Sequence, residues 1–304
     1  MTDVPKLLDR PALHAARRRA KHLGGGPDFL TARVAEDMVE RLAATLRPFA
    51  SAADLGSPTG AIAAAIARRP ETKLVIRAAF DAADEGDVVV DPEALPFAAE
   101  KLGLIVSGLA LHFVDDLPGL LVQARRALAP DGLFLAAFLG GDTLTELRQS
   151  FAIAETATTG GVSPRVLPFA DVRAVGGLLQ RAGFALPVTD VDRVTVRYPN
   201  PLELMRDLRA WGATNMLAER SRKPLRRETL GEALKVYAER FSDPDGRVRA
   251  TFEIVWASGW APHPDQQKPL KPGSATSRLA DALGVAEGDG TAETLPLGGD
   301  RPSQ

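Results

Sequence analysis

Apolar residues recur along the chain with two different spacings. Between residues 29 and 47, Leu30, Val34, Met38, Leu42 and Leu46 recur at every fourth position, which predicts an amphipathic helix with one apolar stripe. Other apolar runs are short and bounded by turn residues, which predicts strands. These runs end at Gly56 or cover residues 73–77, 87–91, 104–106 and 133–139. Because helical patterns separate them, we expect an α/β fold with a doubly wound, Rossmann-like, mostly parallel sheet.

The second half of the chain is predicted to be richer in helices. Helical patterns cover 144–156, 170–182, 201–211 and 224–240, and strand patterns cover 188–191, 194–198 and 251–258. This pattern divides the chain into four parts. They are a helical N-terminal segment at 1–48, the Rossmann-like core at 49–198, a helical addition with a last strand at 199–285, and a Gly-, Pro- and Asp-rich tail at 286–304. We expect the tail to be disordered.

Composition narrows the classes of function. The 304 residues include 37 basic and 39 acidic side chains, so general charge gives no case for nucleic acid as a partner. Cysteine is absent, which excludes disulfides, thiolate metal sites and cysteine nucleophiles. The four histidines are widely spaced, so no metal site is predicted. No apolar run reaches the roughly 20 residues needed to span a bilayer. Without a signal-peptide pattern, a cytoplasmic location is expected.

The glycine turn at residues 54–60 is the first candidate site. Asp54 and Gly56 end the first strand, and Gly60 precedes an alanine-rich helix. A strand, a glycine turn and a helix form the ligand crevice of open α/β sheets. The central position, however, is Pro58, which has no N–H to donate. From these residues alone, a nucleotide-type ligand and a purely structural turn are equally open.

Further candidates follow the next strands. Asp91, with Leu95 in the loop after it, suits either an adenine contact or a turn cap. His112 suits either a substrate crevice or a partly buried packing position. Asp142 suits a helix cap or an acceptor contact. The basic helix at 8–22 suits a solvated face, a flap over a ligand, or a contact with an acidic partner.

The order of these elements resembles the class I S-adenosylmethionine methyltransferases. The stretches that carry this resemblance are Asp54-Leu55-Gly56-x-x-x-Gly60, Asp91, and Leu128-Ala129-Pro130-Asp131-Gly132-Leu133. The resemblance implies S-adenosylmethionine as cofactor. It also implies that Asp54, Gly56 and Gly60 hold the methionine end of the cofactor. Asp91 and Leu95 would then hold the adenine, while His112 and Asp142 would act on the acceptor.

A narrower resemblance covers roughly residues 5–285. It rests on separate stretches in order, among them Gly140-Gly141-Asp142-Thr143-Leu144, Gly160-Gly161, Ser163-Pro164, Arg181-Ala182-Gly183-Phe184, Tyr198-Pro199 and Gly259-Trp260. The chain is similar to the family of mitochondrial complex I assembly factors that hydroxylate an arginine of a quinone-module subunit, and to their bacterial relatives. Its first half is also similar to the malonyl-carrier-protein O-methyltransferases of biotin synthesis. The resemblance implies a protein or carrier-bound substrate, such as a NADH-quinone oxidoreductase subunit. Membrane contact would come only through that partner.

Three departures from the family pattern lie where the cofactor is expected. Pro58 replaces a glycine, Ala78 stands where a ribose-binding acid is usual, and Gly103 replaces an aspartate. A lost donor and a lost carboxylate would each weaken binding by about 1–3 kcal/mol. These departures leave two alternatives open: a cofactor-dependent enzyme, or a non-catalytic assembly chaperone with a degenerate pocket. A dehydrogenase would need a third glycine and an acid near Arg77, and neither is present.

Overall fold

A computed structural model describes residues 6–266. Its centre is a seven-stranded sheet in the order β3-β2-β1-β4-β5-β7-β6. The strands are β1 (Ser51–Leu55), β2 (Leu74–Ala79), β3 (Val88–Val89), β4 (Leu102–Gly108), β5 (Leu128–Leu139), β6 (Ala185–Tyr198) and β7 (Val248–Trp260). Strands β1 to β5 pair in parallel, and β7 runs antiparallel to both β5 and β6. This confirms the predicted doubly wound, mostly parallel sheet.

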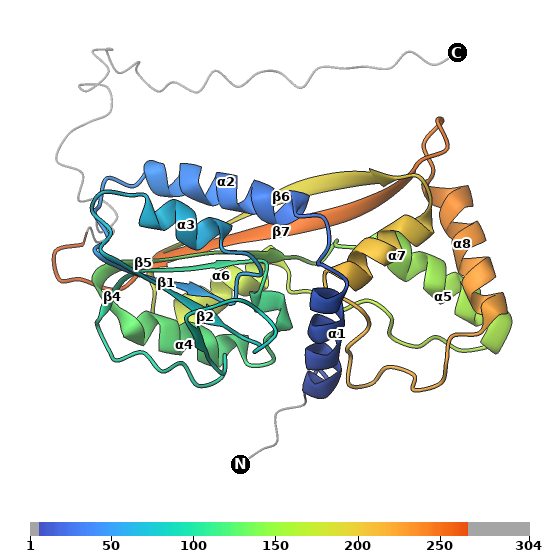
Figure 1. The fold of residues 1–304 in the computed structure, drawn as a ribbon, viewed down its shortest axis with the longest axis horizontal. Coiled ribbons are helices and arrows are strands. Elements are labelled where there is room, and N and C mark those ends of the chain that lie inside the picture. The colour runs from blue at the N-terminus through green and yellow to red at the C-terminus, as the bar shows by residue number, and fades with distance from the viewer. Residues whose placement is uncertain (1–5, 267–304) are drawn as a thin grey trace, which may run out of the picture. The chain divides into compact units, whose positions relative to one another are not determined.

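Helices cover both faces of the sheet. They are α1 (Arg10–His22), α2 (Phe29–Ala43), α3 (Ala61–Ala67), the short 3-10 helix η1 (Leu111–Phe113), α4 (Leu117–Ala127), α5 (Thr145–Thr159), α6 (Val172–Arg181), α7 (Pro201–Ala210) and α8 (Arg227–Phe241). Helices α2 and α3 pack on one face, and α4 and α6 pack on the other (Figure 1). The predicted stripe is confirmed at Leu30, Val34, Met38 and Leu42, which are buried, but it is wrong at Leu46, which lies beyond the end of α2 and is 99% exposed.

Three further helices extend the sheet at one end. Helices α5, α7 and α8 pack around the end of β6 and the start of β7, where Tyr198, Tyr237 and Phe252 are buried together (Figure 1). The start of α7 is fixed locally: Asn200 accepts hydrogen bonds from the N–H groups of Leu202 and Glu203, and Pro201 sets the first turn. These helices form one wall of the cavity described below.

Several predicted boundaries differ from the structure. The strands expected at 188–191 and 194–198 form the single strand β6, because Asp192 and Arg193 stay in register with Ile254 and Glu253 of β7. In an edge strand such charged side chains can face solvent without breaking the ladder. The strand expected at 87–91 shortens to β3, and Asp91 forms only an isolated bridge with Ala94. The tail predicted at 286–304 lies outside the described residues.

Within residues 6–266, no helix combines the length and apolar character needed to cross a membrane. The longest helices, α2, α5 and α8, have 15 residues each, and all carry charged side chains. A helix needs about 20 apolar residues to span the hydrocarbon core.

Candidate active site

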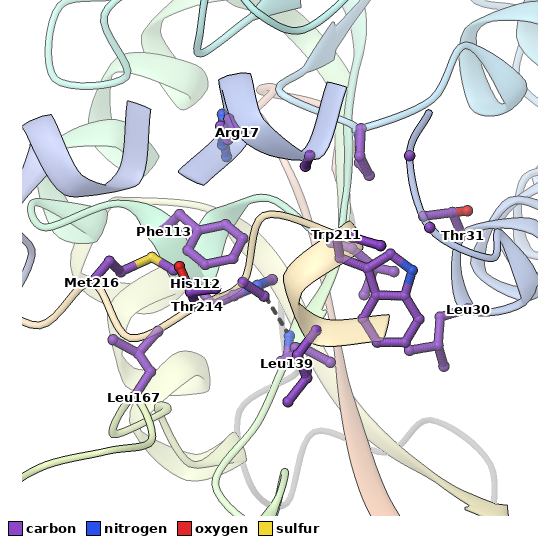
Figure 2. A pocket seen from close by; sticks show the side chains of 18 of the residues that line it. Arg17, Leu30, Thr31, His112, Phe113, Leu139, Leu167, Trp211, Thr214 and Met216 are labelled. Carbon is purple, nitrogen blue, oxygen red and sulfur yellow. Dashed lines mark hydrogen bonds between the residues drawn. The ribbon is translucent and has the colours of Figure 1, made fainter. Parts of the chain in front are cut away.

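A cavity of about 600 Å³ opens at the carboxyl ends of the parallel strands (Figure 2). This is the edge where open α/β sheets bind their ligands. Its lining falls into three groups. The turn after β1 contributes Gly56, Pro58, Thr59 and Gly60. The second group comes from the segment after β2, with Ala83, Asp84 and Glu85, and from helix α1, with Arg17, Ala20 and Lys21. The third group forms an apolar chamber, which includes Leu139, Leu144, Leu147, Leu167, Phe169, Leu208, Trp211, Met216 and Phe252. The volume lies in the range of small-molecule and cofactor sites.

The turn after β1 needs a glycine at its first position. Gly56 has φ +68°, in the left-handed region, and its N–H donates to the carbonyl of Ala78 at 2.8 Å. A Cβ at Gly56 would lie 2.6 Å from Cε2 of Phe80, whose ring packs against this backbone. Gly60 is more open, since its Cβ position lies 3.2 Å from the flexible end of Arg77. The ring of Phe80 therefore narrows the rim beside Gly56.

Asp54 lies beneath this turn and is 2% exposed. Its Oδ1 accepts a hydrogen bond from the Ser57 hydroxyl, and the Ser57 oxygen accepts the N–H of Gly108 at 2.8 Å. The other oxygen, Oδ2, is buried without a hydrogen-bond partner. Burial raises the pKa of Asp54 to about 6, although the Ser57 hydrogen bond opposes the shift. Asp54 does not line the cavity, so its carboxylate supports the turn from below.

Asp91 and Leu95 do not line the cavity. Asp91 accepts the backbone N–H of Glu93 at 2.9 Å and the guanidinium of Arg10 at 3.4 Å. The Glu93 N–H is the main cause that lowers the pKa of Asp91. Leu95 packs against the hydrophobic core, and its N–H donates to Gln123. The predicted adenine contacts are thus occupied by structural partners, which corresponds to the turn-cap alternative for Asp91.

Helix α1 lies over the segment that follows β2. His14 pairs with the buried Asp81, and Arg17 donates to Asp84 at 2.7 Å. Burial raises the pKa of Asp84, and the positive charge of Arg17 opposes the rise. Further along the helix, Lys21 contributes to the cavity wall. The basic helix is therefore more than a solvated face, since it forms part of the cavity wall.

His112 lies in the cavity on η1, directly after β4 (Figure 2). Its Nδ1 accepts a long hydrogen bond, 3.4 Å, from the N–H of Leu139. Its ring centroid lies 4.0 Å from that of Phe113, with the two rings tilted, and 5.8 Å from that of Phe169 in an edge-on contact. Burial, and secondly the charge of Arg17, lower the pKa of His112 to about 3. The imidazole is therefore neutral, with Nδ1 as acceptor and Nε2 carrying the proton.

Asp142 lies outside the cavity lining. Its carboxylate is about half exposed and pairs with Arg193 of β6. Its backbone N–H lies 3.5 Å from an oxygen of Glu253. The chain turns at Gly140-Gly141, so Leu139 and Leu144 line the cavity while the side chain of Asp142 does not. The structure therefore does not bring Asp142 and His112 together in the cavity, as an acceptor contact by both residues would require.

The structure adds residues that the sequence did not single out. Trp211 lines the chamber, and its Nε1 donates to the carbonyl of Pro27 at 2.7 Å. Met216 and Phe113 face the same space (Figure 2). The sequence signals for this wall are the end of the helical pattern at 201–211 and the basic pattern at 8–22. Neither signal shows that the two segments meet.

The strand order, the antiparallel β7 and the cavity at the strand ends define a class I methyltransferase-type fold. A model of the methyltransferase domain matches residues 53–136. The YcgJ protein of Bacillus subtilis shares the fold, with a TM-score of 0.51, 14% identity, and coverage of 76% of this chain and 99% of that one. This likeness is one of fold alone.

Sequence relatives narrow the class. Arginine-hydroxylase NDUFAF5 of Danio rerio is 37% identical over 264 residues, which cover 84% of this chain and 82% of the relative. The human protein is 39% identical, with coverage of 82% and 74%. The malonyl-[acyl-carrier protein] O-methyltransferase of Gallionella capsiferriformans is 31% identical, with coverage of 85% and 93%. The chain belongs to the methyltransferase-like enzyme family that contains NDUFAF5 and these O-methyltransferases.

The residues present fit the amino-acid half of S-adenosylmethionine. The left-handed Gly56 and the open Gly60 lie at the β1 rim, and the carboxylate of Asp54 is buried beneath them without lining the cavity. From this rim the cavity continues to Ala83–Glu85 at the end of β2. The fit at the adenosine end is narrower, because Ala78 supplies no carboxylate, Asp91 is paired with Arg10, and Leu95 packs against the core.

Proposed function

We propose that this protein binds S-adenosylmethionine in the cavity and modifies a protein or carrier-bound substrate. The observation that carries the proposal is that one cavity joins the glycine rim after β1 to a chamber containing a neutral histidine. Asp54, Gly56 and Gly60 would hold the methionine end of the cofactor. The relatives that modify arginine or a malonyl carrier support a polymeric substrate rather than a free metabolite.

The cofactor supplies an activated methyl group on a sulfonium, so the protein's task is mainly positioning. His112 is suited to this task as a donor. With Nδ1 bound to Leu139, its Nε2–H is left to hydrogen-bond an acceptor oxygen. Because its pKa is about 3, His112 stays neutral and adds no positive charge beside the sulfonium. We therefore assign His112 to acceptor orientation and not to proton abstraction.

The apolar chamber supports an acceptor that enters as an extended segment. Trp211, Phe113 and Phe169 supply aromatic faces, and leucine side chains form most of the remaining apolar wall. Of the carboxylates in the lining, Asp84 is paired with Arg17, while Asp28 and Glu85 are exposed at the surface. The chamber therefore recognises its acceptor mainly by shape and aromatic contact.

By its family, we propose a role in respiratory complex I assembly, with a NADH-quinone oxidoreductase subunit as substrate. We also propose that the protein acts in the cytoplasm, although its animal relatives are described as mitochondrial. The test is incubation of the purified protein with methyl-labelled S-adenosylmethionine and the candidate subunit, followed by peptide mass spectrometry. A labelled methyl group on the subunit supports the proposal. An added oxygen without label would replace methyl transfer by hydroxylation, and an unmodified subunit would remove the substrate assignment.

A second candidate is O-methylation of a malonyl carrier protein, which the 31% identity over nearly the whole of a known O-methyltransferase favours. A third is a non-catalytic chaperone, which Phe80 at the rim and Pro58 in the turn favour. Malonyl carrier protein in the same labelling assay distinguishes the second. Binding of the subunit without any cofactor binding in calorimetry distinguishes the third.

A further inference from the structure

Pro58 leaves the β1 turn one backbone donor short for an anionic ligand group. Pro58 lines the cavity at the centre of the turn and has no N–H. S-Adenosylmethionine carries a carboxylate on its amino-acid end, and a carboxylate in a partly enclosed site needs donors. Another part of the cavity wall, helix α1, offers a donor that can take the place of the missing one.

Helix α1 supplies cations to the same cavity. The side chain of Arg17 is 11% exposed, and its Nη1 donates to Asp84 at 2.7 Å. A guanidinium has five N–H donors. Within residues 6–266, Nε and Nη2 of Arg17 have no hydrogen-bond partner, and neither is among the fully buried unsatisfied atoms. Lys21, one turn further along α1, also lines the cavity and forms no ion pair with the described residues.

The position of Arg17 directs its charge into the cavity. Its guanidinium carbon lies 5.4 Å from the ring centroid of Phe113, which itself lines the chamber (Figure 2). The positive charge of Arg17 also helps to lower the pKa of His112. A guanidinium held between a carboxylate and an aromatic face is preorganised to accept a second carboxylate through its remaining donors.

We propose that Arg17 anchors the amino-acid carboxylate of S-adenosylmethionine and replaces the backbone donor that Pro58 cannot provide. The proposal rests on cofactor binding in the proposed function, and it makes α1 part of the cofactor site. The loss of a glycine from the turn is then compensated from a helix that lies 41 positions earlier in the chain.

The test is calorimetric titration with S-adenosylhomocysteine, which has the carboxylate, and with methylthioadenosine, which lacks the whole amino-acid end. For Arg17→Gln we expect the affinity for S-adenosylhomocysteine to fall about 10- to 100-fold, as for loss of a charge-assisted hydrogen bond. We expect its affinity for methylthioadenosine to stay the same. Arg18→Gln is the matched control, since Arg18 is the exposed neighbour on the same helix and does not line the cavity.

Asp84→Asn separates anchoring from a structural role. This variant breaks the same ion pair but leaves the guanidinium in place, so we expect it to keep its affinity for S-adenosylhomocysteine or bind it more tightly. If Asp84→Asn and Arg17→Gln each lower the affinity for both ligands to the same extent, Arg17 only holds α1 in place and the proposal is overturned. Unchanged binding in Arg17→Gln also overturns it. If the wild type binds neither ligand, both this proposal and the cofactor assignment fail. If it binds both but modifies no substrate, only the substrate assignment fails.

Discussion

The two ends of the cavity are built in opposite ways. At the β1 end, consecutive residues make the rim: a buried carboxylate at Asp54 and a left-handed turn at Gly56. At the β2–β3 end, the segments behind the cavity wall are held by contacts from far along the chain. The His14–Asp81 and Arg10–Asp91 pairs join residues 67 and 81 positions apart.

This difference separates a rim built from local backbone geometry from an end held by internal packing. The β1 end keeps the backbone geometry that approaches a ligand, except for one donor at Pro58. The β2–β3 end is occupied by internal packing, with Phe80 against Gly56 and α1 over the acids. Phe80 is the residue at which the two ends meet, because its ring follows β2 and touches the β1 turn.

Replacing Phe80 by alanine should have the largest effect. Phe80 is 8% exposed, and deletion of a buried phenyl ring costs about 3–5 kcal/mol of unfolding free energy. The same change opens the rim beside Gly56, so the affinity for S-adenosylhomocysteine should rise. Denaturant unfolding and calorimetry measure the two effects. Phe184→Ala is the control, since it removes an equally buried ring from the core without touching the rim. Equal ligand affinity in the two variants would show that Phe80 does not restrict the site.

Asp54→Asn should change how stability depends on pH. The pKa of Asp54 is about 6 in the folded protein and about 3.9 in an unfolded chain. Between these values the folded state holds a proton that the unfolded state has lost, so the unfolding free energy falls as pH rises from about 4 to 6. The expected loss is about 3 kcal/mol in the wild type, and it should be absent in the variant. Unfolding of both proteins across this range measures the difference, and a pH-independent difference would contradict the assigned burial.

Gly56→Ala should destabilise the protein by at least about 2 kcal/mol, because a left-handed φ is strained for alanine and the added methyl group meets Phe80. Gly60→Ala is the comparison within the same turn. Its φ of −75° is ordinary, and its Cβ would meet only the movable end of Arg77, so the cost should stay below about 1 kcal/mol. Thermal melts of the two variants test the contrast, and equal costs would remove the special role of Gly56.

Arg10→Gln should have the smallest effect. Arg10 pairs with Asp91 at 3.4 Å and Glu93 at 2.5 Å, and all three side chains are one-third to one-half exposed. Exposed ion pairs contribute less than about 1 kcal/mol. Unfolding free energy and ligand affinity should therefore stay close to the wild-type values. A large gain in affinity for S-adenosylhomocysteine would mean that this one pair, rather than Phe80, closes the β2–β3 end.

The pattern of apolar positions was sufficient to predict the sheet, the buried stripe of α2 and the turn at Asp54–Gly60. These features depend on neighbours within one strand, one helix or one turn, where side-chain period and backbone preference act directly. The same reasoning wrongly predicted two strands in place of β6. The charged residues Asp192 and Arg193 suggest a break between strands when their pairing with β7 is not known.

The side chains that line the cavity could not be predicted from the pattern of apolar positions. Asp91 and Asp142 have the residue type and position of ligand contacts, yet Arg10 and Arg193 neutralise them from distant segments. Trp211 and Arg17 enter the cavity from elements that flank the core in sequence. Local sequence thus determined where a pocket forms, because strand ends and glycine turns are local. Tertiary packing decided which side chains face it, because each carboxylate binds the nearest cation in space, however far that residue lies along the chain.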